Sequence, residues 1–268
     1  MSQPDTSSMA VFCDFENVAL GVADANHDDF DIGRVIERLL LKGSIVVKKA
    51  YCDWERYKGF KTAMHEASFE LIEIPHVRLS GKNSADIRMV VDALDLCYTK
   101  SHVDTFVIIS GDSDFSPLVS KLRENAKTVI GVGVRDSTSK LLTRNCDEFI
   151  FYDDLVQPNK PERPAKASNT KKKTAKRAPT KKEELEQEGF DVVVETIQAL
   201  ANERGGSGRI WGSMVKQTIM RRRPEFNESH YGFSGFSAML EEMQRQKLLT
   251  IDHDDRSGGY VIKEWSAG

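Results

Sequence analysis

Short apolar runs alternate with segments of helical periodicity over the first 155 residues. The apolar runs predict six strands, at 9–13, 45–52, 71–74, 105–110, 128–134 and 148–152. Between them, apolar residues recur every three or four positions, which predicts helices around 32–40, 87–94 and 115–122. Short buried strands that alternate with helices are typical of a mostly parallel, doubly wound α/β sheet. We therefore expect this fold class for the N-terminal part of the chain.

The C-terminal part follows a different pattern. A first helix is predicted from residue 185 to a break at 205–208, and its apolar stripe consists of Val193, Val194, Ile197, Leu200 and Ala201. A second helix is predicted at 210–220, and a third carries Phe233, Phe236, Met239, Leu240 and Met243. The runs 248–251 and 260–262, with a polar turn between them, predict a hairpin. Three helices followed by a hairpin indicate a small winged-helix domain at 185–265, in which helical spacing favours a core position for Phe233 and Phe236.

Residues 156–184 separate the two parts. This segment is rich in Pro, Lys, Ala, Ser and Thr and lacks large apolar side chains, which predicts a disordered basic linker. Ten Lys and Arg stand against Glu162 alone between positions 160 and 182, a net charge of +9, whereas the flanking segments carry −7 and −5. Two interpretations stay open: a spacer alone, or a spacer that also attracts phosphates through counterion release.

Composition indicates the general class of protein. A chain with 40% hydrophobic and 29% charged residues is typical of soluble globular proteins. No apolar run is long enough to span a membrane, and the N-terminus has no signal-peptide pattern, so we expect a cytoplasmic protein. The cysteines are scattered without CxxC spacing, which favours buried free thiols over disulfides or zinc ligands. They are Cys13, Cys52, Cys97 and Cys146.

Aspartates follow three of the predicted strands. Asp14 ends the first strand, Asp53 ends the second, and Asp112 and Asp114 follow the fourth. The carboxyl ends of parallel strands meet at one edge of a sheet, where ligands bind. Hard cations such as Mg²⁺ prefer oxygen ligands, and a bound cation polarises a phosphate and lowers the pKa of a water nucleophile. The sequence therefore predicts a metal-assisted hydrolase, and it contains no glycine-rich dinucleotide or ATP loop.

Two further aspartates lie on the helix predicted around 87–94. Asp86 shares a stripe with apolar residues and is expected to point inward or toward the sheet edge; the alternative is a carboxylate favoured by the helix dipole. Asp92 lies with Arg88 and Asp95 on the opposite face, where a solvated Arg88–Asp92 pair explains it.

The turn Ser110-Gly111-Asp112-Ser113-Asp114 also has a structural interpretation. It can cap the helix that begins near Phe115, with Ser113 or Asp114 as the N-cap residue. Capping and metal binding are compatible, so both interpretations are kept.

Three motifs, in this order and spacing, resemble the NYN domain, a branch of the PIN-like ribonucleases, over residues 8–155. They are Asp14-Phe15-Glu16-Asn17, Lys82-Asn83-Ser84-Ala85-Asp86 and Ser110-Gly111-Asp112-Ser113-Asp114-Phe115. The resemblance implies a Rossmann-like parallel sheet with helices on both faces and an RNA-cleaving site dependent on Mg²⁺ or Mn²⁺. The implied catalytic and metal-site acids are Asp14, Asp86, Asp112 and Asp114, and the implied substrate-binding residues are Asn17, Lys82, Ser110 and Ser113. The family often has Gly-Val where Ser84-Ala85 stand, a departure that leaves the acid in place.

The C-terminal part resembles a LOTUS (OST-HTH) domain, which is a winged-helix module. The similar stretches are 208–210, 223–228 and 231–236. The resemblance implies RNA binding or docking to a protein partner. A net charge of −5 confines nucleic-acid contacts to local positions. The candidates are Arg209, Arg221, Arg222, Arg223 and Tyr231, with the wing around Arg256 in addition.

Three functions remain in competition. The first is a metal-dependent ribonuclease that hydrolyses single-stranded or structured RNA. The second is a non-catalytic RNA-binding or adaptor protein with a degenerate or structural metal site. A Toprim-like DNA-processing site ranks last, because that fold would place a glutamate where this chain has Asp14.

Overall fold

The computed structural model describes residues 7–25, 29–74, 84–156, 181–203, 209–254 and 258–265. These residues belong to two compact units, one within Met1–Gln157 and one within Pro158–Gly268. Each unit has its own hydrophobic core. The two units are therefore described separately.

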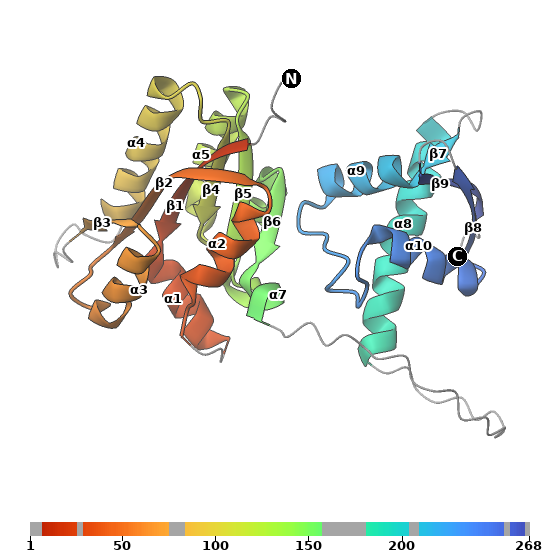
Figure 1. Ribbon diagram of the computed structural model, residues 1–268, viewed down its shortest axis with the longest axis horizontal. Coiled ribbons are helices and arrows are strands. Elements are labelled where there is room, and N and C mark those ends of the chain that lie inside the picture. The colour runs from red at the N-terminus through yellow and green to blue at the C-terminus, as the bar shows by residue number, and fades with distance from the viewer. Residues whose placement is uncertain are drawn as a thin grey trace. The chain divides into compact units, whose positions relative to one another are not determined.

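The first unit is built on a six-stranded sheet with the order β3-β2-β1-β4-β5-β6 (Figure 1). Its strands are β1 (Ser7–Asp14), β2 (Gly43–Cys52), β3 (Glu70–Glu73), β4 (Thr105–Ile109), β5 (Thr128–Gly133) and β6 (Glu148–Phe151). All neighbouring strands run parallel, which confirms the predicted α/β sheet. The strand order reverses direction between β1 and β4, and ligands bind at such a switch point, outside the carboxyl ends of the strands.

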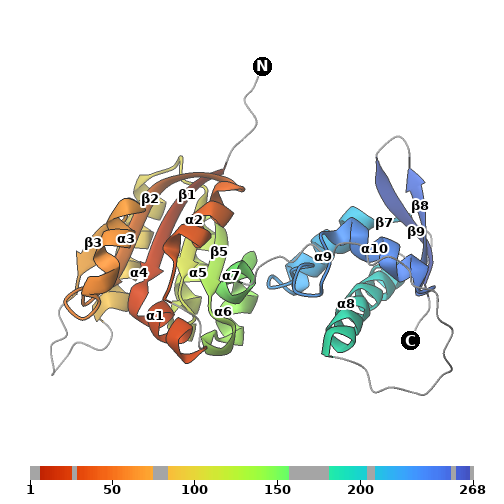
Figure 2. The same cartoon turned by 60° about the horizontal axis from the view of Figure 1, so that its bottom comes forward.

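Helices cover both faces of the sheet, as the fold prediction requires (Figures 1 and 2). One core layer includes side chains from α1 (Phe15–Asp24), α2 (Ile32–Leu40), α3 (Lys61–Glu66) and α7 (Tyr152–Val156). The opposite layer includes side chains from α4 (Ser84–Thr99), α5 (Ser116–Glu124) and α6 (Lys140–Asn145). Three short 3-10 helices complete the unit: η1 (Lys58–Phe60), η2 (Ser113–Phe115) and η3 (Arg135–Ser137).

Strand β1 lies in the middle of this arrangement and is buried on both faces. Met9, Val11 and Cys13 belong to one core layer, whereas Ala10 and Phe12 belong to the other. This alternation follows from the two-residue side-chain period of a strand. A strand that is apolar on both faces reads as a continuous apolar run, which is how the sequence identified it.

The second unit contains three helices and a three-stranded antiparallel sheet. The helices are α8 (Lys181–Glu203), α9 (Gly212–Arg222) and α10 (Phe236–Arg245). The strands β7 (Ile210–Trp211), β8 (Leu249–Asp254) and β9 (Gly259–Trp265) pair in the order β7-β9-β8. The expected helices and terminal hairpin are therefore present.

Three predicted helix boundaries in this unit were wrong. The second helix begins at Gly212 rather than at 210, because Ile210 and Trp211 pair with β9 as a short strand. The third helix begins at Phe236, so Phe233 lies in the preceding loop, where it packs against Phe190 with ring centroids 5.5 Å apart. The first helix already begins at Lys181.

The core of the second unit consists of the predicted apolar stripes. Val193 and Ile197 of α8 and Phe236, Met239 and Leu240 of α10 are buried together. The core position expected for Phe236 is confirmed, and Phe233 packs against the same cluster while remaining partly exposed.

The four cysteines are buried and free, as predicted. Most of the expected linker at 156–184 and the expected helix break at 205–208 lie outside the described residues. Among the helices that the structure describes, none is both long enough and apolar enough to cross a membrane.

A glycine on β5, the strand beside the edge strand β6, provides a test of the packing. A Cβ atom at Gly131 of β5 would lie 2.3 Å from two ring carbons of Phe149 and 3.0 Å from the Cys146 Sγ atom. We expect Gly131→Ala to lower the free energy of unfolding by about 1–3 kcal/mol, because the ring must leave its place. The control is Gly59→Ala, where no heavy atom lies within 4 Å. Urea unfolding of both variants is the measurement, and equal effects would contradict the described packing.

Candidate functional site

The predicted acids lie at the carboxyl edge of the sheet, on both sides of the switch point. Asp14 is the last residue of β1, and Asp112 and Asp114 follow β4 directly. Because β1 and β4 are parallel neighbours, their carboxyl ends lie side by side. Asp53 follows β2 at the same edge, and its Oδ1 accepts a hydrogen bond from the Glu55 amide 3.2 Å away, within a turn.

Asp14 is the most buried of these acids, with 8% of its surface exposed. Its carboxylate caps α1 by accepting a hydrogen bond from the Asn17 amide, and it accepts another from the Ser110 hydroxyl at 3.0 Å. Burial and the nearby charge of Asp86 raise the pKa of Asp14 from 3.8 to about 7, although these two hydrogen bonds lower it. The carboxylate is therefore fixed in place but costs free energy when it is ionised.

The turn after β4 is built around the Ser110 side chain, which is fully buried. The Ser110 Oγ atom donates to Asp14 and accepts from the Asp112 amide at 3.1 Å. The Asp112 Oδ1 atom in turn accepts from the Asp114 amide at 3.0 Å and so caps η2. The cap is thus Asp112, and the prediction of Ser113 or Asp114 as the N-cap was wrong. The Ser110 side chain has no exposed surface, and its hydroxyl contacts Asp14. It therefore does not lie where a substrate could contact it.

Asn17 holds the same turn from the side of α1. Its Oδ1 atom accepts a hydrogen bond from the Gly111 amide at 2.8 Å. The Gly111 carbonyl accepts a further bond from the Ser139 amide at 2.9 Å. A Cβ atom at Gly111 would lie 2.7 Å from the Ser137 carbonyl oxygen, so only glycine fits between these neighbours. Asn17 therefore positions the turn that carries Asp112 and Asp114.

Asp86 lies in the first turn of α4 and is partly buried. Burial and the charges of Asp112, Asp114 and Glu16 raise its pKa. The charges of Asp112, Asp114 and Glu16 are therefore close enough to Asp86 to disfavour its ionised form.

Glu16 is an acid that the sequence analysis did not select. Its charge is among those that raise the pKa of Asp86, and its Oε1 atom accepts a hydrogen bond from Arg56 Nη1 at 3.0 Å. The signal in the sequence was its position two residues after Asp14, in the first turn of the following helix. Arg56 follows β2 in the sequence. Its ion pair with Glu16 places the Arg56 guanidinium beside the acidic edge.

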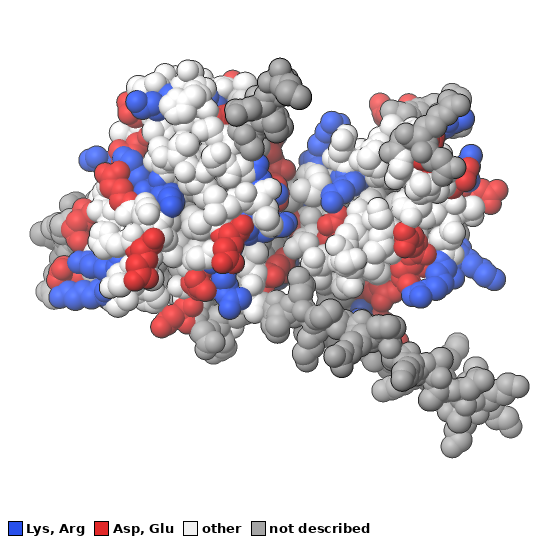
Figure 3. Space-filling model, viewed as in Figure 1, with Lys and Arg blue, Asp and Glu red and all other residues white. Residues whose placement is uncertain are grey.

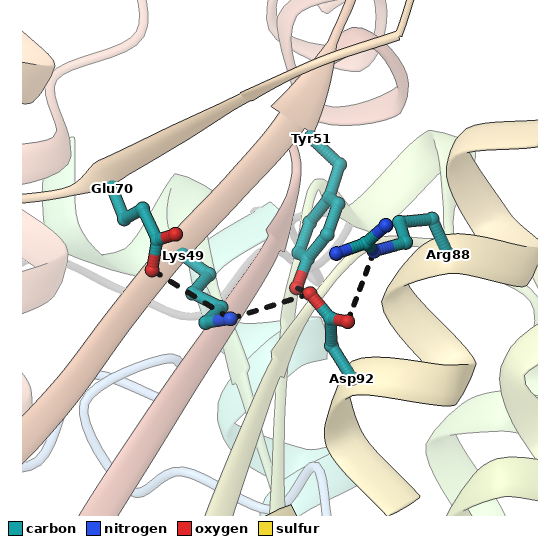
Figure 4. Close-up of polar contacts among 5 residues, drawn as sticks. All are labelled: Lys49, Tyr51, Glu70, Arg88 and Asp92. Carbon is teal, nitrogen blue, oxygen red and sulfur yellow. Dashed lines mark hydrogen bonds and ion pairs between the residues drawn. The ribbon is translucent and has the colours of Figure 1, made fainter. Parts of the chain in front are cut away.

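Asp92 does not lie on a solvated face, so that prediction was wrong. Its side chain is only 12% exposed, because it contacts the sheet as well as its own helix (Figure 4). The expected ion pair with Arg88 is present at 3.0 Å. Lys49 and Tyr51 of β2 also donate to this carboxylate.

The basic candidates of the second unit differ in their surroundings. Arg222 and Arg223 share the carboxylate of Glu195, at 2.7 and 3.2 Å, whereas Arg209 and Arg221 are exposed. Tyr231 is partly buried, and its ring centroid lies 5.3 Å from that of Phe226.

The face of the molecule drawn in Figure 3 has few continuous charged areas. On the face drawn in Figure 3, acidic and basic side chains are interspersed. Any polyanion contact on this face is therefore local. Lys82, the expected phosphate contact, and Arg256 lie outside the described residues, and Ser113 is partly buried in η2.

The donor set of the acidic edge consists of carboxylate oxygens, which suits Mg²⁺ or Mn²⁺ rather than zinc. Mutual repulsion and burial make joint ionisation of these carboxylates costly, and a divalent cation would offset that cost. Within the described ranges, no three His, Cys, Asp or Glu side chains form a group ready to hold a metal ion. The chemistry of the residues fits a hard cation, but the side chains do not converge.

The sequence of the first unit matches a known protein family. The family model described as the NYN domain matches residues 8–153. The chain belongs to the NYN domain family. This family is ribonuclease-like in general and has a PIN-like nuclease fold, in agreement with the six-stranded parallel sheet. The predicted NYN membership is confirmed, and the match does not extend to the second unit.

Two relatives of this NYN protein are similar over about half of the chain. An uncharacterized protein of Methanocaldococcus jannaschii is 26% identical over 141 residues, which cover 53% of this chain and 55% of that protein. The chain thus spans about half the length of this curated relative. A crystal structure of a protein of unknown function from Vibrio parahaemolyticus has a TM-score of 0.51 and 26% identity, covering 58% of this chain and 98% of that one. Neither relative brings an assigned activity.

The raised pKa of Asp14 predicts a dependence of stability on pH. A carboxyl whose folded-state pKa exceeds its unfolded value stabilises the fold below the unfolded pKa, and this contribution is lost as pH rises through the folded pKa. We therefore expect the unfolding free energy of the metal-free protein to lose a contribution on the order of 4 kcal/mol from Asp14 between about pH 4 and pH 8. Asp14→Asn should remove this contribution. Urea unfolding with a chelator, at pH 5 and pH 8, measures the difference.

The matched control for this measurement is Asp95→Asn, since Asp95 is an exposed acid on α4. This variant should retain the pH dependence of the wild type. Parallel pH dependences for the wild type and Asp14→Asn would contradict the account of a buried, repelled carboxylate.

Proposed function

We propose that this NYN protein is a metal-dependent ribonuclease that hydrolyses RNA phosphodiester bonds at the carboxyl edge of its parallel sheet. One observation carries the proposal: Asp14 is buried and Asp86 partly buried beside other carboxylates, and this environment raises the pKa of both. Structural roles rarely require acids to repel one another in a partly buried position, whereas cation binding does. The ribonuclease-like character of the family supports the same function.

The proposal assigns Mg²⁺ or Mn²⁺ to Asp14, Asp86, Asp112 and Asp114. When bound, such an ion would polarise the scissile phosphate and supply a water nucleophile of lowered pKa. The protein's own contribution is to orient the acids. Ser110 holds both the Asp14 carboxylate and the Asp112 backbone, and Asn17 holds Gly111. We therefore place Ser110 and Asn17 among the positioning residues, and keep Lys82 and Ser113 as substrate contacts.

RNA is proposed as the substrate because the fold is nuclease-like and the family is ribonuclease-like. Unpaired or structured RNA suits an open sheet edge, since splayed nucleotides can approach carboxylates that a stacked duplex would keep at a distance. Arg56 adds a cation at this edge through its pair with Glu16, and both side chains are partly exposed. A phosphate of the substrate can replace Glu16 as the partner of Arg56.

For the second unit we propose a winged-helix module of the LOTUS type that presents RNA or docks to a protein partner. Its support is the order of three helices with a terminal hairpin, together with the sequence resemblance. Arg209, Arg221, Arg222 and Arg223 are all exposed, but Arg222 and Arg223 would have to exchange Glu195 for a phosphate. The proposed domain limits remain 8–155, 156–184 and 185–265.

One observation favours the alternative of a non-catalytic RNA-binding or adaptor protein. In the part of the chain that the structure describes, the carboxylates do not form a group that could hold a metal ion. Metal binding would therefore have to draw them together, at the cost of their mutual repulsion until the ion arrives. Cleavage assays decide between the two functions.

The first prediction of this proposal concerns Asp112. Cleavage of RNA should require Mg²⁺ or Mn²⁺, and Asp112→Asn should reduce its rate by about 100-fold or more, because several kcal/mol of charge stabilisation are lost. RNA affinity should stay within a few-fold of the wild type. The measurement is metal-dependent cleavage of RNA and DNA, with binding measured in parallel. Asp95→Asn is the control and should retain activity.

Cleavage without added metal in the presence of a chelator would argue against this mechanism. So would an Asp112→Asn variant that cleaves at the wild-type rate. Binding without cleavage by the wild type would favour the adaptor alternative.

The second prediction concerns the two compact units. Removing residues 158–268 should weaken RNA affinity more than it slows turnover at saturating RNA, because the acidic site lies within the first unit. The affinity of the full chain should fall steeply with salt if basic residues of the removed part contact phosphates. Fluorescence anisotropy at several salt concentrations and single-turnover cleavage measure the two effects. Unchanged affinity after the removal would count against an RNA-presenting role.

A further inference from the structure

A polar cluster lies between the sheet and α4. Figure 4 shows its members: Lys49 and Tyr51 from β2, Glu70 from β3, and Arg88 and Asp92 from α4. Asp92 is its centre. The Asp92 Oδ2 atom accepts from the Tyr51 hydroxyl at 2.9 Å and from Lys49 Nζ at 3.3 Å, and its Oδ1 atom accepts from Arg88 Nε at 3.0 Å.

Both carboxylate oxygens of Asp92 are thus occupied, and its side chain is 12% exposed. Burial by itself would raise the pKa of Asp92, but the hydrogen bond from Tyr51 and the charge of Lys49 outweigh it, so the pKa is lowered. Asp92 therefore stays ionised inside this cluster. Its oxygens already contact two cationic groups, so Asp92 differs from the repelled acids of the sheet edge.

The cluster connects α4, which carries Asp86, to β2, the strand beside the one that ends in Asp14. Tyr51 is the partner of Asp14 in the β1–β2 register, and Asp92 follows Asp86 on the same helix. Six residues of α-helix span about 9 Å. The Tyr51–Asp92 hydrogen bond thus fixes α4 to the sheet, one strand away from Asp14 and less than two turns from Asp86.

The apolar contacts of α4 are less directional than its polar contacts. Its buried side chains against the sheet are Met89, Ala93 and Cys97, and Val90, Leu94 and Leu96 pack against the same core while partly buried. Apolar contact is non-directional, whereas hydrogen bonds to a charged group are directional. The hydrogen bonds of Asp92 therefore supply directional contacts that the apolar face of α4 lacks.

Small rotations of α4 matter at Asp86. A rotation of about 20° would move a carboxylate about 5 Å from the helix axis by about 2 Å. Metal–ligand distances tolerate only about 0.2 Å. We propose that Asp92 is a positioning residue, which sets the rotation of α4 through Tyr51, Lys49 and Arg88 so that Asp86 faces Asp14 and Asp112. This inference rests on the proposed function, because it concerns the acids of the same site.

The test uses the full chain and two readouts that do not require catalysis. Calorimetry without RNA measures Mn²⁺ affinity, and hydrogen exchange of the metal-free protein measures protection of the α4 amides. Asp92→Asn should weaken Mn²⁺ binding by about 10–100-fold and speed exchange in α4. Tyr51→Phe removes only one hydroxyl group and should shift both readouts in the same direction by less. It remains informative if Asp92→Asn does not fold.

The matched control is Asp104→Asn. Asp104 also accepts several hydrogen bonds, from the Ser7 and Thr105 hydroxyls at 2.6 and 2.7 Å and from the Ser8 amide at 3.2 Å. It precedes β4, at the opposite edge of the same sheet. Asp104→Asn should lower the melting temperature as Asp92→Asn does, yet leave Mn²⁺ affinity and α4 exchange unchanged.

The outcomes distinguish a failure of the proposed metal site from a failure of the positioning role of Asp92. If the wild type binds no Mn²⁺, the proposed metal site fails, and hydrogen exchange still decides whether Asp92 orients α4. If the wild type binds Mn²⁺ and Asp92→Asn binds it equally well, the positioning role is overturned. It is also overturned if Asp104→Asn reproduces the Asp92→Asn losses, since both would then follow from general destabilisation.

Discussion

The carboxylate of Asp14 sits at the end of a strand that is buried on both faces, and the candidate site depends on how the protein tolerates that burial. Two neutral donors stabilise the charge, namely the Ser110 hydroxyl and the Asn17 amide. These donors do not offset the burial of the carboxylate and its repulsion by Asp86 and Asp112, so the pKa of Asp14 stays raised to about 7. The fold thus holds a carboxylate that is only partly ionised near pH 7, and under the proposed function a divalent cation would favour its ionised form.

The acids around Asp14 come from separate elements, and polar contacts hold each of these elements in place. The turn after β4 is held by Ser110 and by the Asn17–Gly111 hydrogen bond, and α4 by the contacts of Asp92. These polar contacts are made by neutral groups or by ion pairs whose two charges offset each other. They can therefore lie close to the acidic edge without neutralising it, which leaves the negative charge of the edge available to a ligand.

The sequence predicted the parts that depend on local pattern. Strands buried on both faces appear as apolar runs, and parallel pairing then places Asp14 and Asp112 at one edge. Contacts between distant segments were not predictable. Asp92 was assigned to the solvent because its partners Lys49 and Tyr51 lie some forty residues earlier, and the ion pairs of Arg222 and Arg223 with Glu195 were not predicted because Glu195 lies 27 and 28 residues earlier. Helix α1 was not predicted, although Phe15, Val18 and Val22 recur at helical spacing and are buried.

An acidic edge of this kind imposes a division of labour on any nuclease that uses it. Before a cation binds, Asp86 and its neighbours repel the phosphates of RNA as they repel one another. Binding energy for the polyanion must then come from cations outside the acidic group. In the described first unit, Arg56 is such a cation, and it is already compensated by Glu16. The strongly basic stretch at 160–182 has the opposite balance, with ten basic residues against one acid. Under the proposed function, RNA is therefore captured where the charge is positive and cleaved where it is negative, and the bound metal ion makes the two compatible.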